Sequence, residues 1–392
     1  MIVPHSFAAV ALVSLLNFVS AADRTVAEQS AIADPAKQCE AYYYAPVAEQ
    51  LPNFPKTWTT ATIPASDTTA RTKFNSISNS IPKIQPKGPE IMVTVQSYDK
   101  VNDPDCWWTA GGCTKPKLAG IPEDISLIPE PRTLGYGFDD GPNCSHNAFY
   151  DYLTSHNQKA TMFFIGSNVL GWPLQAKRAF EDGHEICTVG LIKLVRVRSS
   201  KPLLRRLISF LVTAFTDEEA WAELYYIIGF KPPLGDIDDR IRYIAHSLGL
   251  TTMLWKYDTY DSHPGPSGLV EVDTVEKHYK EFIDTAKSGA FNHEGAILLM
   301  HESSNLTMSQ AVKWYPDLKD AFEHIVPVGV AMNNTQIYVE SSITSPTFQQ
   351  YVSARGSTVE EEESNGALSL SASLSTLAMI MSAILYCTSA TF

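Results

Sequence analysis

Two adjacent carboxylates, Asp139 and Asp140, are the residues whose type and placement most directly suggest chemistry. They lie in the segment 137–142, which reads GFDDGP and follows the apolar run 133–136. Neighbouring carboxylates raise each other's pKa, so a metal ion or a cationic side chain is the usual reason to place them where a strand runs into a turn. The alternative is turn chemistry alone, with Asp accepting backbone hydrogen bonds, Gly adopting positive φ and Pro fixing the next residue.

Four further segments share a family pattern with the acidic pair. Together, the five stretches are residues 129–147, 160–169, 182–188, 236–242 and 297–302. They resemble the polysaccharide deacetylases with a NodB-type domain, which form carbohydrate esterase family 4, and most closely the fungal chitin deacetylase branch. The resemblance spans roughly residues 100 to 335.

The resemblance implies a reaction in which a metal-bound water attacks the acetamide carbonyl of an N-acetylated sugar. It implies that Asp139 is the general base, that Asp140 is a metal ligand and that His301 is the general acid that protonates the departing amine. Taken alone, His301 would be interpreted as a buried histidine with satisfied hydrogen bonds, but its place at the end of the predicted strand 296–300 favours catalysis. The implied cofactor is a divalent metal, zinc or cobalt, which lowers the pKa of bound water from about 15.7 to about 7.

The second motif of the family is absent at its expected position. Two metal-binding histidines, spaced His-x-x-x-His, should follow Thr188, but residues 189–193 read VGLIK. A catalytic zinc site normally has three protein ligands, so Asp140 alone cannot retain the ion. Lys193 would also add a positive charge where a cation should bind.

Two other motifs are altered. In the third, the family's Arg-Pro-Pro-Tyr-Gly-Asp becomes residues 231–236, KPPLGD, and in the fourth Asp-x-x-Asp-Trp becomes residues 258–262, DTYDS. A lysine cannot reproduce the planar, two-pronged contact of an arginine with a carboxylate. The resemblance assigns orientation or substrate contact to the residues at the matching positions: Lys231, Leu234, Asp236, Asp258 and Asp261.

The segment 189–212 has a composition of its own. It carries six Lys or Arg residues and no acidic residue, within a chain of net charge −13. The family pattern stops at Thr188 and resumes near residue 213, and such sharp edges favour a retained intron or a mis-joined exon in the gene model. A basic surface helix is the second interpretation. A basic amphipathic face for an anionic membrane is the third, although the pattern is short for it.

The hydrophobic pattern predicts alternating strands and helices. Strands are expected at 133–138, 161–165, 251–255 and 296–300, and helices at 148–155, 174–181, 239–247 and 272–288. Apolar strands separated by amphipathic helices indicate a parallel sheet covered by helices. We therefore predict an α/β fold, a distorted (β/α) barrel of the NodB type over 126–335. Only residues 227–230 lie between Tyr226 and Lys231, where a helix end and a strand are expected, so the barrel is predicted to be incomplete between 189 and 231. The Pro- and Thr-rich residues 22–125 predict an irregular N-terminal arm.

Both ends of the chain carry targeting signals. Residues 1–21 are typical of a secretory signal peptide, with an apolar run and a small-residue cleavage site. After a Ser/Glu-rich stalk at 336–364, residues 365–392 carry small residues, a spacer and an uncharged apolar tail, the pattern of a GPI-anchor signal with attachment at Asn365. A short transmembrane helix is the alternative, but the apolar tail is shorter than the roughly 20 residues that span a bilayer. We expect a secreted protein of the cell wall and the outer face of the plasma membrane.

The cysteines fit an oxidising compartment. Five remain once the two end segments are removed, so at most two disulfides form and one thiol is left over. Cys106 and Cys113, seven residues apart in a Trp- and Gly-rich loop, are candidate partners. Glycosylation sequons begin at Asn143, Asn305 and Asn333.

Composition supports a globular protein that acts on a neutral or cationic partner. A chain of 392 residues with 44% hydrophobic residues can bury a sizeable core, and its negative charge argues against nucleic acid. The sequence therefore predicts a metal-dependent chitin deacetylase that releases acetate from N-acetylglucosamine units and leaves chitosan. The alternative is an inactive, chitin-binding wall protein that lacks the metal-binding histidines.

Overall fold

The computed structural model describes residues 23–54, 63, 65, 67–87, 95–190, 229–338 and 343–355. The signal peptide, the basic segment beyond Gly190 with Lys193, and the GPI-anchor signal with Asn365 lie outside these residues, and their assignments stay predictions. Within the described part of the chain, no helix is both long and apolar enough to cross a membrane.

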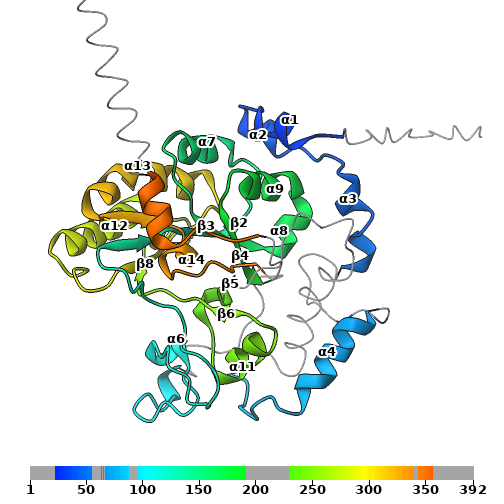
Figure 1. The fold of residues 1–392 in the computed structure, drawn as a ribbon, viewed down its shortest axis with the longest axis vertical. Helices are drawn as coiled ribbons and strands as arrows, with labels where there is room; N and C mark the ends of the chain where they lie inside the picture. The colour runs from blue at the N-terminus through cyan, green and yellow to red at the C-terminus, as the bar shows by residue number, and fades with distance from the viewer. Residues whose placement is uncertain are drawn as a thin grey trace, which may run out of the picture.

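Nine short strands form two parallel sheets in the described residues (Figure 1). One sheet has the order β7-β8-β1-β9 and the other β2-β3-β4-β5-β6. The side chains of β3 are all buried, as expected for a parallel sheet that is covered on both faces. The strands are β1 Thr133–Gly135, β2 Gly137–Gly141, β3 Thr161–Ile165, β4 Glu185–Gly190, β5 Gly229–Phe230, β6 Thr251–Thr252, β7 Tyr257–Asp258, β8 Ala296–Leu299 and β9 His324–Val326.

The chain passes directly from one sheet into the other. β1 and β2 are separated only by Tyr136, and a parallel bridge connects Asp139 of β2 to His301, just beyond β8. This continuous parallel arrangement, with helices outside it, confirms the predicted α/β distorted barrel. β4 also pairs directly with β5 at Thr188 and Phe230, so the sheet is continuous between the strands that flank the basic segment.

The helices around the sheets follow the predicted periodicity. In α12, Val275, Tyr279, Phe282 and Ile283 are buried, and their spacing places them on one face of the helix. The four predicted helices are present, and α13 was missed because Pro316 interrupts its pattern. The helices of the domain are α7 Asn147–Ser155, α8 Gly166–Gly171, α9 Pro173–Glu181, α11 Asp239–Ser247, α12 Val272–Lys287, α13 Asn305–Ala321 and α14 Val328–Ala331, with a 3₁₀ turn η2 at Pro233–Gly235.

The N-terminal arm is more helical than predicted. It runs along one side of the domain in Figure 1 and contacts it through α1, which packs against α9. Its anchors include the side chain of Asn147, which donates hydrogen bonds to the carbonyls of Gln29 and Ile32. The elements of the arm are α1 Val26–Ser30, α2 Pro35–Gln38, α3 Ala45–Ala48, η1 Leu51–Asn53, α4 Thr68–Ser78 and α6 Trp108–Gly111.

The start of the predicted stalk belongs to the folded domain. Ile337 and Tyr338 lie in the main hydrophobic core, and Phe348 packs into a second cluster. Residues 348–355 are helical, and Arg355 donates a hydrogen bond to Gln158. The Ser/Glu-rich composition of 336–364 concealed these apolar anchors, so the predicted stalk boundary at 336 is corrected to a position after 355.

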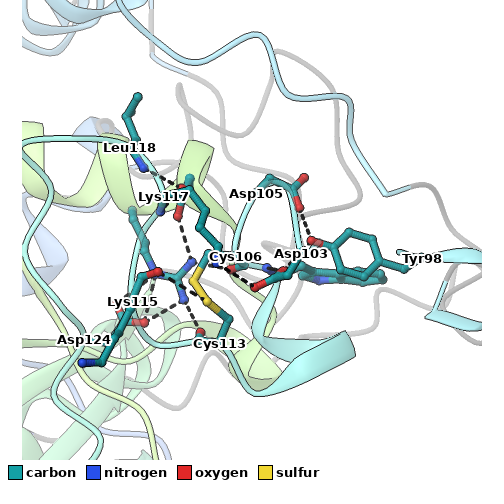
Figure 2. Close-up of a disulfide and its surroundings, with 12 residues drawn as sticks. Tyr98, Asp103, Asp105, Cys106, Cys113, Lys115, Lys117, Leu118 and Asp124 are labelled. Atoms are coloured by element: carbon teal, nitrogen blue, oxygen red, sulfur yellow. Dashed lines mark hydrogen bonds and ion pairs between the residues drawn. A yellow bond between two sulfur atoms is a disulfide. The ribbon is translucent and has the colours of Figure 1, made fainter. Parts of the chain in front are cut away.

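Two disulfides hold the arm. Cys106 and Cys113 are bonded as predicted, and Cys39 bonds Cys144 across a separation of 105 residues, a pairing the sequence did not reveal. Cys187 is the remaining thiol among the described residues and is buried. Figure 2 shows the first disulfide with Asp124 beside it and Tyr98 directed toward two aspartates.

A buried arginine ties this disulfide loop to the domain. Arg242 of α11 donates hydrogen bonds to both carboxylate oxygens of Asp124 and to the carbonyl oxygens of Cys106 and Cys113. The side chain of the neighbouring Asp239 accepts hydrogen bonds from two backbone N–H groups in the loop that follows the disulfide. Together they fix the loop that carries α6 against the carboxyl end of the barrel strands.

Candidate active site

The acidic pair lies at the end of β2, where the chain turns sharply. Asp140 has φ of 67°, in the left-handed region, and Gly141 follows it. A Cβ on Gly141 would lie 1.4 Å from Oε1 of Glu302, so only glycine fits against that carboxyl group. The glycine thus allows β2 and the segment after β8 to approach each other closely, in addition to its part in the turn.

Backbone hydrogen bonds bring Asp139 and His301 to neighbouring positions. The N–H of Asp139 donates to the carbonyl of Met300 at 2.9 Å, and the N–H of Glu302 donates to the carbonyl of Asp139 at 3.0 Å. Both residues stand at the carboxyl ends of parallel strands, where active sites of barrel folds are found. The two groups predicted to act as base and acid are therefore side by side.

Lys231 forms an ion pair with Asp139. Its Nζ lies 2.7 Å from Oδ1 of Asp139, and both side chains are buried. The ammonium also lies 3.8 Å from the ring centre of Phe163, a cation–π contact. Burial raises the pKa of Asp139, and the charges of Lys231 and His301 oppose that rise. The pair holds one oxygen of the carboxylate, while within the described residues the other oxygen has no hydrogen-bond partner.

His301 is oriented by Asp261. Oδ1 of Asp261 lies 2.7 Å from Nδ1 of the imidazole, and Oδ2 accepts the backbone N–H of His301 at 3.0 Å. Burial alone would lower the pKa of His301, but the hydrogen bond and charge of Asp261, together with Asp139 and Asp140, raise it above its usual value. The hydroxyl of Ser262 lies 3.3 Å from Nε2. These contacts favour the cationic form of the imidazole, which is the form that a general acid requires.

The other predicted residues divide into two groups. Asp258, the last residue of β7, is half-buried, and its Oδ1 accepts the N–H of Tyr260 at 2.7 Å. Burial raises the pKa of Asp258, and His263 and His301 are among its charged neighbours. Leu234 is 45% exposed with φ of 60°, beside the Lys231 segment. Leu234 is thus open to solvent, and Asp258 lies within electrostatic range of His301.

Asp236 is bonded to the N-terminal arm. It is buried, and its Oδ1 accepts hydrogen bonds from Nε1 of Trp107 and the hydroxyl of Thr109. These two bonds fasten the arm to the loop after β5, and the role in orientation or substrate contact that the resemblance implies for Asp236 stays a prediction. The sequence could not reveal these partners, because they lie more than 120 residues away in the chain.

Sequence reasoning missed the group beneath the acidic pair. The carboxyl of Glu302 lies against Gly141, and Tyr150 donates a hydrogen bond to its Oε2 at 2.9 Å. Burial raises the pKa of Glu302 to about 8, opposed by the bonds from Tyr150 and the backbone of Asn143. Asn168 donates to the carbonyl of Asp140 at 2.9 Å. Only the adjacency of Glu302 to His301 signalled this role in the sequence.

The described residues do not complete a metal site at the acidic pair. Asp140, the predicted ligand, is buried at the end of β2. The one group of three suitable ligand atoms found among the described residues is Asp103, Cys106 and Cys113, where the two cysteines are joined in a disulfide. A single carboxylate is too small a donor set for zinc or cobalt, so no catalytic step is assigned to a metal.

The three sequons differ in accessibility. Asn305, at the start of α13, is exposed, and its Oδ1 accepts a hydrogen bond from Ser145. Asn143 is half-buried, and its own Oδ1 accepts the N–H of Ser145. Asn333 is exposed, and its Oδ1 accepts the N–H of Phe348. Asn305 and Asn333 are therefore the two exposed sequon positions, and Asn143 is the least accessible of the three.

Comparison with known proteins identifies the family. A family model described as polysaccharide deacetylase matches residues 128–253. Chitin deacetylase 2 of Cryptococcus neoformans var. grubii is 46% identical over 334 residues, which cover 81% of this chain and 70% of that protein. The chain belongs to the chitin deacetylase family.

Other members and a solved structure extend the comparison. The chitin deacetylase of Amylomyces rouxii is 39% identical to this member of the family, over 80% of this chain and 74% of that protein. The structure of the chitin deacetylase from Colletotrichum lindemuthianum has a TM-score of 0.45 and 20% identity, covering 54% of this chain and 92% of that chain. Polysaccharide deacetylases of this family are generally metal-dependent hydrolases.

Proposed function

We propose that this chitin deacetylase family member hydrolyses the N-acetyl groups of N-acetylglucosamine units in chitin. The reaction releases acetate and leaves the free amine of chitosan. Identity of 46% to a chitin deacetylase supports the substrate class. The observation that carries the chemistry is the pairing of Asp139 with Lys231 beside that of His301 with Asp261.

The residues of the site divide the proton transfers between them. The free oxygen of Asp139 takes a proton from the attacking water, and Lys231 keeps the carboxylate ionised and oriented. His301, held as the imidazolium by Asp261, gives its proton to the nitrogen as the carbon–nitrogen bond breaks. An amine is a far better leaving group than an amide anion, so this protonation is the essential contribution of His301.

Leu234 and Asp258 supply substrate contacts in this proposal. An exposed leucine in the left-handed region is strained, and such strain concentrates at binding sites. It lies three residues after Lys231, whose ammonium pairs with the catalytic base Asp139. Asp258 offers acceptor oxygens to sugar hydroxyls on the other side of the site.

Secretion and anchoring complete the proposed role. A signal peptide and a GPI anchor attached at Asn365 would place the enzyme on the outer face of the plasma membrane, facing chitin in the wall. Both disulfides fit an oxidising compartment. A glycan at Asn305 is part of the same proposal. Release of the protein from intact cells by a GPI-cleaving phospholipase would support the anchor.

The test of the activity is acetate release from chitin oligosaccharides by the purified full chain, with Zn²⁺ or Co²⁺ supplied. Acetate that appears with wild type and not with His301→Ala supports deacetylation. Binding of the oligosaccharides without acetate, with no metal retained after dialysis, would instead establish the inactive chitin-binding alternative. A panel of other acetylated glycans separates chitin from related substrates.

A further inference from the structure

Tyr260 occupies an unusual position at the mouth of the site. It follows β7 with φ of 57°, a conformation that is an outlier for a bulky residue, and its side chain is 42% exposed. Its backbone N–H donates to Oδ1 of Asp258, which holds the turn. The chain thus accepts both strain and the exposure of an aromatic ring at this point.

The exposed ring is supported from behind by two histidines. The ring centre of His278, on α12, lies 4.4 Å from that of Tyr260 with an angle of 31° between the planes. The ring of His263 lies 5.0 Å away. These contacts restrict the rotation of the tyrosine and leave part of its surface to solvent, which is the arrangement of a rigid platform.

The two residues that follow Tyr260 in the chain connect it to the catalytic groups. Asp261 holds Nδ1 of His301, and the hydroxyl of Ser262 lies 3.3 Å from Nε2. The loop that orients the general acid therefore also presents Tyr260 outward. Asp261 and Ser262, which both contact the imidazole, directly follow Tyr260 in this loop.

We propose that Tyr260 is a stacking platform for a pyranose ring next to the sugar that is deacetylated. This inference rests on the proposed function, because it takes the ligand to be a β-linked N-acetylglucosamine chain. One face of such a ring carries C–H groups that pack on an aromatic face, while its hydroxyls stay in water. An amphipathic tyrosine, half-exposed and pre-oriented, suits that contact and loses little conformational freedom on binding.

The test compares Tyr260→Ala with Tyr260→Phe in the full chain. The dissociation constant for chitin tetraose, measured by calorimetry, is expected to rise about three- to tenfold in Tyr260→Ala and to stay near wild type in Tyr260→Phe. His278→Ala, which removes the support, is expected to give a smaller loss. Leu269→Ala, another exposed residue between β7 and α12, is the matched control and should change nothing.

Two further results decide between the platform and a merely structural role. If Tyr260 stacks on a neighbouring sugar, Tyr260→Ala should raise KM for the tetraose with little change in kcat, and acetate release from a small sugar-free acetyl ester should be unaffected. Unchanged tetraose affinity in a folded Tyr260→Ala would overturn the proposal, as would an equal loss in Leu269→Ala. Binding is measured without turnover, so tight binding without acetate release would disprove the proposed function and leave the platform supported.

Discussion

Two sets of buried charges hold loops in this molecule, and they are satisfied to different degrees. The guanidinium of Arg242 donates hydrogen bonds to both carboxylate oxygens of Asp124 and to two backbone carbonyls, so the charged groups of that set are hydrogen-bonded on several sides. Asp139, in the active site, has a single bond from Lys231 and keeps its second oxygen open within the described residues. The first set serves stability, and the second keeps one acceptor available for a proton.

The difference shows what distinguishes a catalytic ion pair from a structural one. A buried charge that has lost its water must be compensated by hydrogen bonds, and each missing bond costs stability. The site accepts that cost at Asp139, where burial raises the pKa and the nearby cations oppose the rise. Variants in the two sets should therefore separate loss of activity from loss of folding.

Replacing Asp139 by Asn is expected to have the largest effect. The amide cannot accept a proton from water, so kcat for acetate release should fall by about 10³-fold, as expected for loss of a general base. The melting temperature should also fall, because the neutral amide leaves the buried ammonium of Lys231 without a counter-charge. Asp236→Asn is the control, since its carboxylate is buried but serves the arm: it should melt lower and retain more activity. Equal activity loss in the two variants would contradict the distinction.

Replacing Arg242 by Met should give the opposite pattern. Removing one partner of a buried set leaves Asp124 uncompensated, and such changes typically cost about 3–5 kcal/mol of unfolding free energy. The measurement is denaturation by urea with the disulfides intact. The double variant Arg242→Met with Asp124→Leu should recover part of the loss, because the unpaired charge is gone. A single variant as stable as wild type would show that the set is not structural.

Replacing Asp261 by Asn should shift the pH profile. Asp261 raises the pKa of His301, so its loss lowers that pKa and leaves less imidazolium at a given pH. The alkaline limb of kcat/KM should move to lower pH, with a fall of about 10- to 100-fold at neutral pH and a smaller fall in acid. Asp258→Asn, a more distant carboxylate, should shift the limb less. An unchanged limb would assign it to a group other than His301.

The sequence predicted what is local and periodic. The helices at α11 and α12 follow a 3.6-residue spacing, and the pairing of Cys106 with Cys113 needs only a short loop. Asp139 and His301 were found because each stands at the end of an apolar strand within a family motif. The reach of Lys231 to Asp139 was less evident, since lysine replaces the arginine of the motif.

What the sequence did not reveal depends on contacts between distant segments. The disulfide from Cys39 to Cys144, the turn of Asp236 toward Trp107 and the packing of Phe348 on the domain all join parts of the chain whose spacing follows no period. Their residue types allowed several partners, and only the fold selects among them. The carboxyl of Glu302 against Gly141 belongs to this class, although it lies beside a catalytic residue.

Glu302 gives the smallest effect and the finest test of the comparison. Burial raises its pKa from an ordinary value of 4.5 to about 8, so between these pH values the folded state binds a proton that the unfolded state has lost. The free energy of unfolding should therefore fall as the pH rises from about 4.5 to about 8. Glu302→Gln should remove roughly 1–3 kcal/mol of this fall. Melting temperatures measured across this range give the slope directly.

Glu185 supplies the matched control for this measurement, because burial raises its pKa to about 7 at a distance from the acidic pair. Glu185→Gln should flatten the curve only up to about pH 7, whereas Glu302→Gln should act up to about pH 8. If Glu302→Gln flattens no part of the curve, the carboxyl against Gly141 is not protonated in the folded enzyme. The carboxylate of Glu302 beneath Asp139 and Asp140 would then be a third buried charge. The active site would in that case resemble the Arg242 set more closely than the open oxygen of Asp139 indicates.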